Sequence, residues 1–201
     1  MTETQGTPPG AIILAGGQSR RMGTDKALLR LKPGGPRLLE MVLAAVQPLV
    51  TGIVISTNRP DAYTWTGLPL VADNFPNRGP LAGLEAGLAA SRAETNLVVA
   101  CDMPWLEVAL LAFLLKQAPG YQAVVPLNPE GRAEPLCAVY SKECLPVIRR
   151  HLAEDSLKMS GWLEDVKTLF VPALKLAELD PELRSFRNLN RPTDLPVMYN
   201  E

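Results

Sequence analysis

Short apolar runs alternate with longer segments of helical periodicity along most of this chain. The apolar runs are rich in Val, Ile and Leu and predict β-strands, which we place at 11–15, 52–56, 68–72, 97–101, 121–126, 136–140 and 168–171. In the segments between them, apolar residues recur every three or four positions, which predicts helices at 38–49, 79–91, 106–116, 142–152 and 157–166. A last helix is expected to begin near Pro192.

The predicted strands are apolar at nearly every position rather than at every second one. Strands of this kind are buried on both faces, which indicates a mostly parallel sheet with helices packed on each side. We therefore predict an α/β fold. In open sheets of this class, ligands bind beyond the carboxyl ends of the strands, so the loops that follow the strands are the first places to search for a site.

Composition narrows the class of protein. A chain of 201 residues fits a single domain, 1–201, in which we expect residues 1–9 to be a flexible tail. With a net charge of −1, the chain lacks the basic excess of a nucleic-acid-binding protein. Its first residues do not match a signal-peptide pattern, and it has no Cys-x-x-Cys pair and no apolar run near the ~20 residues of a membrane span. We expect a soluble, cytoplasmic protein that binds neither nucleic acid nor membrane.

A glycine-rich loop, AGGQSRRMGTDK, directly follows the first predicted strand. Gly16 and Gly17 allow the backbone to turn sharply and bring its N–H groups close to an anion. Arg20 and Lys26 add cationic donors for phosphate oxygens. The segment matches neither the P-loop nor the dinucleotide-binding pattern. A solvated loop is the alternative, but Arg-Met-Gly and Asp-Lys at this spacing favour phosphate binding.

An aspartate, Asp102, ends another buried strand in the segment VVACDMPWL. Its carboxylate is expected to face the glycine-rich loop across the sheet, where it could hold Mg²⁺ between itself and the oxygens of a triphosphate. The alternative is that Asp102 caps the helix predicted at 106–116, although it lies early for that position.

The signature L-A-G-G-x-x-x-R-M-G-x-D-K, together with C-D-x-P around Asp102, resembles the MobA-like nucleotidyltransferases, and most closely the molybdenum cofactor guanylyltransferases. The resemblance implies a Rossmann-like, three-layer α/β/α domain with a mostly parallel, mixed central sheet. It also implies that Leu14, Ala15 and Gly16 contact the nucleotide, that Lys26 neutralises its phosphates and that Asp102 is a Mg²⁺ ligand.

Further segments extend the resemblance. It implies that Asp73 lies in the nucleotide pocket, although Asp73-Asn74 also favours an Asx-turn and both can hold. Asn58 is the expected contact to the base or ribose, with Ser56 as an alternative position. In RNLNRPTDL, Asn188 and Asn190 could reach back to the metal or the second substrate, or Asn190 could simply begin a helix.

The implied reaction is transfer of GMP from GTP to molybdopterin, with release of pyrophosphate, to form the guanine dinucleotide cofactor. Lys26, Asp102 and Arg20 are the expected catalytic residues and Mg²⁺ the expected cofactor. A phosphate nucleophile is already an anion, so the reaction needs alignment and charge neutralisation more than a base. Molybdoenzymes or cofactor-delivery proteins are possible recipients of the product.

Other functions remain open from the residues alone. In the resembled family, L-A-G-G tends to accompany guanine, so this chain favours GTP over a cytidylyltransferase or a sugar-phosphate enzyme. A non-catalytic nucleotide-binding protein is a further alternative, against which the joint presence of Lys26, Asp73 and Asp102 argues. The single histidine, His151, follows two arginines on a predicted helix and is expected to be exposed. Other basic residues of the C-terminal half are expected to be solvated surface.

Overall fold

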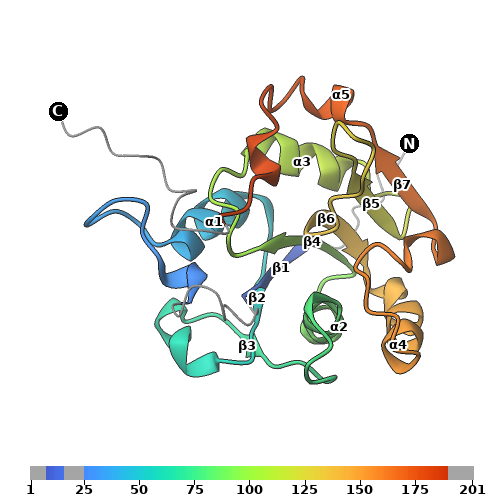
Figure 1. The fold of residues 1–201 in the computed structure, drawn as a ribbon, viewed down its shortest axis with the longest axis horizontal. Coiled ribbons are helices and arrows are strands. Elements are labelled where there is room, and N and C mark those ends of the chain that lie inside the picture. The colour runs from blue at the N-terminus through green and yellow to red at the C-terminus, as the bar shows by residue number, and fades with distance from the viewer. Residues whose placement is uncertain (1–7, 16–24, 190–201) are drawn as a thin grey trace.

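The computed structural model describes residues 8–15 and 25–189. Seven strands of this part of the chain form one sheet, in the order β3-β2-β1-β4-β6-β5-β7 (Figure 1). The strands are β1 (Gly10–Leu14), β2 (Ile53–Ser56), β3 (Leu70–Val71), β4 (Thr95–Ala100), β5 (Ala123–Pro126), β6 (Cys137–Ser141) and β7 (Thr168–Val171). The α-helices are α1 (Leu38–Val46), α2 (Pro80–Ala90), α3 (Val108–Lys116), α4 (Leu145–Ala153) and α5 (Ala173–Leu176).

The sheet is mostly parallel, with β6 antiparallel to both of its neighbours. This arrangement confirms the predicted mixed sheet. Strand β1 lies between β2 and β4, where Ile13 is in register with Ile55 and Val99. All the strands except β6 therefore end at the same edge of the sheet, and the loop after β1 begins near the middle of that edge.

Helices cover both faces of the sheet and enclose two apolar cores. Figure 1 shows α1 and α3 on one face and α2 and α4 on the other. Alternate residues of β1 enter different cores: Ile13 packs with the residues of α1 and α3, whereas Ile12 and Leu14 pack with those of α2 and α4. Both faces of the central strands are thus buried, which is why they read as apolar throughout. The three-layer α/β/α prediction is confirmed.

Helix α2 presents two glycines to the sheet, and these let its backbone approach the strands closely. A Cβ atom on Gly87 would lie 2.3 Å from Ile12 Cγ2, and one on Gly83 would lie 2.9 Å from Ser56 Oγ. Gly83 is in the first turns of α2, so the beginning of this helix lies against the carboxyl ends of β1 and β2. The absence of side chains at these two positions therefore sets the distance between α2 and the sheet.

The helix predicted at 157–166 is wrong. The structure has turns there, followed by a short 3₁₀ helix, Leu163–Asp165. Ser160-Gly161 disfavours a continuous helix, and Trp162 is completely buried with its ring centroid 5.4 Å from that of Tyr140. Packing of one large side chain therefore overrides a weak helical period. The short helix α5 was not predicted, and the helix expected near Pro192 lies outside the described residues.

In the described ranges, no helix is both long and apolar enough to cross a membrane. Of the expected tail at 1–9, residues 1–7 lie outside the described part of the chain, and Pro9 accepts a hydrogen bond from the Thr51 N–H group at 3.0 Å.

Candidate functional site

The predicted glycine-rich loop leaves the sheet between the ends of two neighbouring strands. Ala15 donates its N–H to the Ser56 carbonyl oxygen at 2.9 Å, and the Leu14 carbonyl oxygen accepts from the Cys101 N–H at 3.1 Å. Leu14 and Ala15 are both buried. The predicted residues Gly16, Gly17 and Arg20 lie outside the described residues. The backbone bonds nonetheless fix the point from which the loop departs.

Lys26 is the first residue of the 3₁₀ helix Lys26–Leu28. Its Nζ is 3.2 Å from Oδ2 of Asp102, 76 residues further along the chain. Both side chains are largely buried, with 20% and 16% of their surface exposed. Asp102 does not cap the following helix, because the N-cap residue of α3 is Glu107. The structure thus brings together two of the three predicted catalytic residues.

Asp25, directly before Lys26, anchors the turn that carries it. Its Oδ1 accepts from the Ala27 N–H at 3.2 Å, and both carboxylate oxygens accept from the Tyr63 hydroxyl at 2.8 Å. Arg59 pairs with the same carboxylate at 3.5 Å. Asp25 entered the sequence prediction only as part of the Asp-Lys motif, without a role of its own, and Tyr63 was not singled out. An aspartate preceding a short apolar turn is a capping signal that could have identified Asp25, but no local pattern identifies Tyr63 as its partner.

The predicted pocket residues after β2 and β3 are also brought together. Asn58 donates from Nδ2 to Asp73 Oδ2 at 2.6 Å, and its Oδ1 accepts from the Asp73 N–H at 3.0 Å. Asn58 is exposed, whereas Ser56, the alternative position, is buried. A Cβ atom on Gly83 would lie 3.6 Å from Asp73 Oδ1, so the start of α2 borders this pair. The sheet edge therefore carries an amide and a carboxylate beside a helix beginning.

The C-terminal segment returns to the same edge. Leu189 donates its N–H to the Asp102 carbonyl oxygen at 3.0 Å. Its neighbour Asn188 has a side-chain oxygen that is buried and has no hydrogen-bond partner among the described residues. Buried polar atoms are almost always satisfied, so this oxygen, next in sequence to the residue that contacts Asp102, is a candidate donor to a ligand. Asn190 lies outside the described residues.

The donor set at this edge fits Mg²⁺. The described residues contain no group of three or more His, Cys, Asp or Glu that could form an all-protein metal cage. Mg²⁺ seldom uses one: it is held by one or two carboxylates, substrate phosphates and waters. The Asp102 carboxylate and the unpaired Asn188 oxygen are hard oxygen donors of the required kind.

Cys101, between β4 and Asp102, is not set up as a nucleophile. Burial is the main cause that raises the pKa of its thiol well above the ordinary range, and the neighbouring Asp102 carboxylate adds to the effect. The thiol therefore stays neutral near pH 7, and thiolate chemistry is absent from this position.

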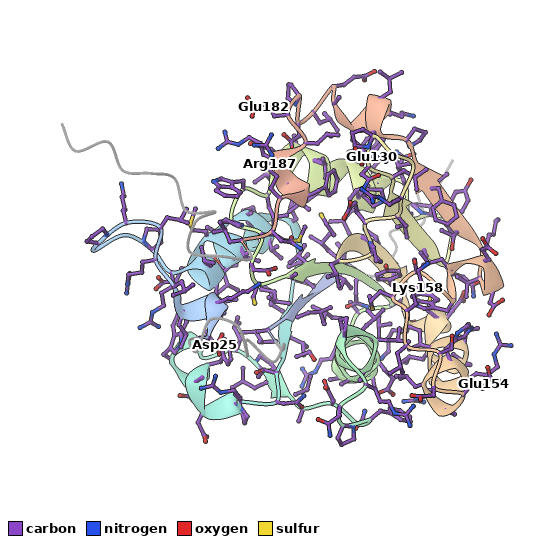
Figure 2. All side chains as sticks on the ribbon, in the orientation of Figure 1. Asp25, Glu130, Glu154, Lys158, Glu182 and Arg187 are labelled. Carbon is purple, nitrogen blue, oxygen red and sulfur yellow. The ribbon has the colours of Figure 1, made fainter. Side chains whose placement is uncertain are left out.

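Lys158 and the basic residues of α4 lie away from this edge. Figure 2 shows Lys158 and Glu154 on the opposite side of the molecule from Asp25. Arg150 pairs with Asp165 in an exposed ion pair, which agrees with the expectation of solvated surface. His151, however, was expected to be exposed and is buried, and its Nε2 lies 2.7 Å from Asp165 Oδ2. Its ring thus has a structural partner.

Comparisons with known proteins agree with this geometry. Residues 11–168 match the family model of the MobA-like NTP transferase domain. A probable molybdenum cofactor guanylyltransferase from Chloroflexus aggregans is 39% identical over 199 residues, covering 93% of this chain and 91% of that protein. A molybdenum cofactor guanylyltransferase from Desulfosudis oleivorans is 35% identical over 92% of this chain and 91% of its own length.

A solved structure shares the fold. Molybdopterin-guanine dinucleotide biosynthesis protein A from Archaeoglobus fulgidus superposes with a TM-score of 0.78 at 28% identity, covering 92% of this chain and 94% of that one. The family model spans the glycine-rich loop, the Lys26–Asp102 pair and the Asn58–Asp73 pair. The chain belongs to the MobA-like NTP transferase family, and it is a nucleotidyltransferase.

Proposed function

We propose that this enzyme transfers GMP from GTP to molybdopterin and releases pyrophosphate. The observation that carries the proposal is the contact of Lys26 with Asp102, which joins the end of the glycine-rich loop to the end of β4. A metal-bound triphosphate requires a cation beside its phosphate oxygens and a carboxylate beside its metal ion, and this junction supplies both. Relatives named as molybdenum cofactor guanylyltransferases support the choice of nucleotide and acceptor.

In the proposed reaction, an oxygen of the terminal phosphate of molybdopterin attacks the α-phosphorus of GTP. One P–O bond forms to the α-phosphorus, the bond from it to the β-phosphate bridging oxygen breaks, and that electron pair leaves with pyrophosphate. Lys26 neutralises charge that builds on the phosphates, assisted by Arg20 and by the backbone N–H groups of Gly16 and Gly17. The nucleophile is an anion, so the chain need supply no general base.

Asp102 would hold Mg²⁺, and the Asn188 side-chain oxygen is the second candidate ligand. When bound, the ion would neutralise phosphate oxygens and help to align the leaving group. In the structure, Asp102 pairs with Lys26, which keeps both charged groups satisfied before the nucleotide arrives.

We assign guanine selection to Leu14, Ala15 and Gly16 together with the Asn58–Asp73 pair. Asn58 and Asp73 offer an amide and a carboxylate that can hydrogen-bond a ribose or base. Molybdoenzymes or cofactor-delivery proteins would receive the product.

The test is pyrophosphate release with purified protein, molybdopterin, Mg²⁺ and each of GTP, CTP, ATP and UTP. The expected result is release that requires all three components and is fastest with GTP. Each nucleotide is also tested for stabilisation against heating, which should be largest for the true substrate because a bound ligand raises the melting temperature. Release that is fastest with CTP, or that proceeds without the pterin, would overturn the proposal.

A further inference from the structure

Tyr63 has a fully buried ring whose hydroxyl points at the loop that carries Lys26. It lies between two 3₁₀ helices, Pro60–Ala62 and Thr64–Thr66, in the connection from β2 to β3. None of its surface is exposed, and its hydroxyl is 2.8 Å from both oxygens of Asp25. Burial raises the pKa of Tyr63 well above the ordinary value, so the hydroxyl keeps its proton and donates it in this hydrogen bond.

Asp25, held by Tyr63, in turn holds the backbone of the turn that carries Lys26. While it accepts from Tyr63, its Oδ1 also accepts from the Ala27 N–H and caps the 3₁₀ helix Lys26–Leu28. The far end of the same turn is tied as well, because Leu29 accepts from the Leu38 N–H at 2.8 Å. The backbone of Lys26 is therefore held at both ends by groups that belong to the protein core.

Restraint of the backbone affects how precisely the long side chain of a lysine places its Nζ atom. The side chain of lysine has four rotatable bonds, and fixing it in one geometry costs conformational entropy. Restraining the Cα atom limits the positions that Nζ can sample. The Nζ atom therefore reaches Asp102, at 3.2 Å, without a change in the backbone conformation. Errors of about 1 Å in the placement of such a group can cost a hundredfold in rate.

We propose that Tyr63 and Asp25 are positioning residues, in which the Tyr63 hydroxyl holds Asp25 and Asp25 holds the turn that places Lys26 at Asp102. Neither residue touches the nucleotide in this account. The effect on rate rests on the proposed function, whereas the effect on the turn does not. Tyr63 thereby couples the β2–β3 connection, which also carries Asn58, to the cation at the phosphates.

The chain offers a matched control. Tyr140 is also fully buried, and its hydroxyl donates a single hydrogen bond to the Pro135 carbonyl oxygen at 2.9 Å. Tyr140 packs in the other core, with α2 and α4, whereas Tyr63 packs in the core of α1 and α3. Tyr63→Phe and Tyr140→Phe each delete one buried hydroxyl, so a purely structural role predicts the same consequences for both.

The first measurement is amide hydrogen exchange of the segment 25–29, read by mass spectrometry on the full-length protein without ligands. Tyr63→Phe is expected to raise the exchange rate of this segment by about tenfold, because the cap at Ala27 loosens when its acceptor is freed. Tyr140→Phe is expected to leave it unchanged. Equal exchange in the wild-type protein and Tyr63→Phe would overturn the proposal, whatever reaction the enzyme catalyses.

The second measurement is steady-state kinetics with GTP, Mg²⁺ and molybdopterin. Tyr63→Phe is expected to lower kcat by roughly tenfold with little change in KM for GTP, whereas Tyr140→Phe stays within about twofold of wild type in both. Asp25→Ala should lower kcat at least as much, and adding Tyr63→Phe to it should have no further effect, because both act through one contact. Losses that multiply in the double variant, or equal losses in the two tyrosine variants, would overturn the proposal.

Failure of the proposed function would look different. If the wild-type protein releases no pyrophosphate with GTP and molybdopterin, the assignment of the reaction fails. The hydrogen-exchange comparison still decides whether Tyr63 holds the turn of Lys26.

Discussion

The two halves of the sheet use polar side chains differently at the same edge. Around β1, β2 and β4, hydrogen bonds join residues that are far apart in the sequence, such as Lys26 with Asp102, 76 residues apart, and Tyr63 with Asp25, 38 apart. In the loop from β5 to β6, the contacts are local: Asn128 donates to Glu134, only 6 residues away. Figure 2 shows Asp25 well separated from Glu130 of the second half.

The difference indicates where precision is required. Long-range contacts exist only when several strands are in register, so they tie the geometry of the first half to the whole fold. The loop between β5 and β6 is organised by its own residues, since Asn128 also accepts from the Glu130 and Arg132 N–H groups. We therefore expect changes in the first half to alter chemistry, and changes in the second half to alter mainly stability or acceptor binding.

The largest effect is expected from the pair that joins the two strands of the first half. Lys26→Ala and Asp102→Asn should each reduce pyrophosphate release by at least about a hundredfold, because each removes a charge that faces the reacting phosphates. Far-UV circular dichroism should remain that of the wild type. Lys175→Ala, at an exposed lysine of α5, is the control and should leave turnover unchanged. Near wild-type turnover in either site variant would remove the distinction between the halves.

A smaller effect is expected where α2 meets the first half, and the two glycines of this helix separate chemistry from packing. Gly83→Ala places a methyl group 2.9 Å from Ser56 Oγ and near Asp73, which should raise KM for GTP by roughly three- to tenfold. Gly87→Ala forces a methyl group against Ile12 in the core instead, and should lower the free energy of unfolding by about 1–3 kcal/mol.

Kinetics and chemical denaturation of the two glycine variants form the test. Gly87→Ala should leave KM for GTP unchanged, although it is the more destabilised of the two. The comparison breaks down if both variants raise KM equally, because KM would then follow stability rather than the location of the change.

The smallest effect on chemistry is expected at the end of α4. The hydrogen bond from His151, with smaller help from Arg150, lowers the pKa of the Asp165 carboxyl. Stability from this contact is complete above the ordinary carboxyl pKa of about 3.9 and is lost as the pH falls through the lowered value of the folded state. Asp165→Asn should therefore reduce the acid-side dependence of the melting temperature on pH, with GMP transfer unaffected. Melting scans from neutral to acidic pH provide the measurement, and an unchanged pH dependence would contradict it.

Much of the fold was predictable because strands buried on both faces leave a continuous apolar run. Residues such as Ile12 and Ile13, which enter opposite cores, produce that signal directly. The segment 157–166 failed because its conformation depends on Trp162 packing against Tyr140, a contact that no local period encodes. His151 was misjudged for a similar reason, since its buried ring contacts Asp165, 14 residues away.

The candidate site was predictable where chemistry sits in a local motif. Lys26 and Asp102 follow strands in recognisable segments, and their meeting follows from β1 and β4 being neighbours. Tyr63 carries no such mark: it is one aromatic residue in an irregular connection, and only the folded chain reveals that its hydroxyl reaches Asp25. Residues that position a site thus leave weaker traces in the sequence than residues that contact the ligand.

The most direct test of the central claim follows the α-phosphate. The wild-type protein and Asp102→Asn are incubated with Mg²⁺, molybdopterin and GTP labelled at its α-phosphorus, with labelled CTP as the comparison. The account predicts that the label enters a pterin dinucleotide from GTP in the wild type, and that Asp102→Asn forms almost none. Label entering the pterin from CTP in preference to GTP, or equally in both proteins, would contradict it.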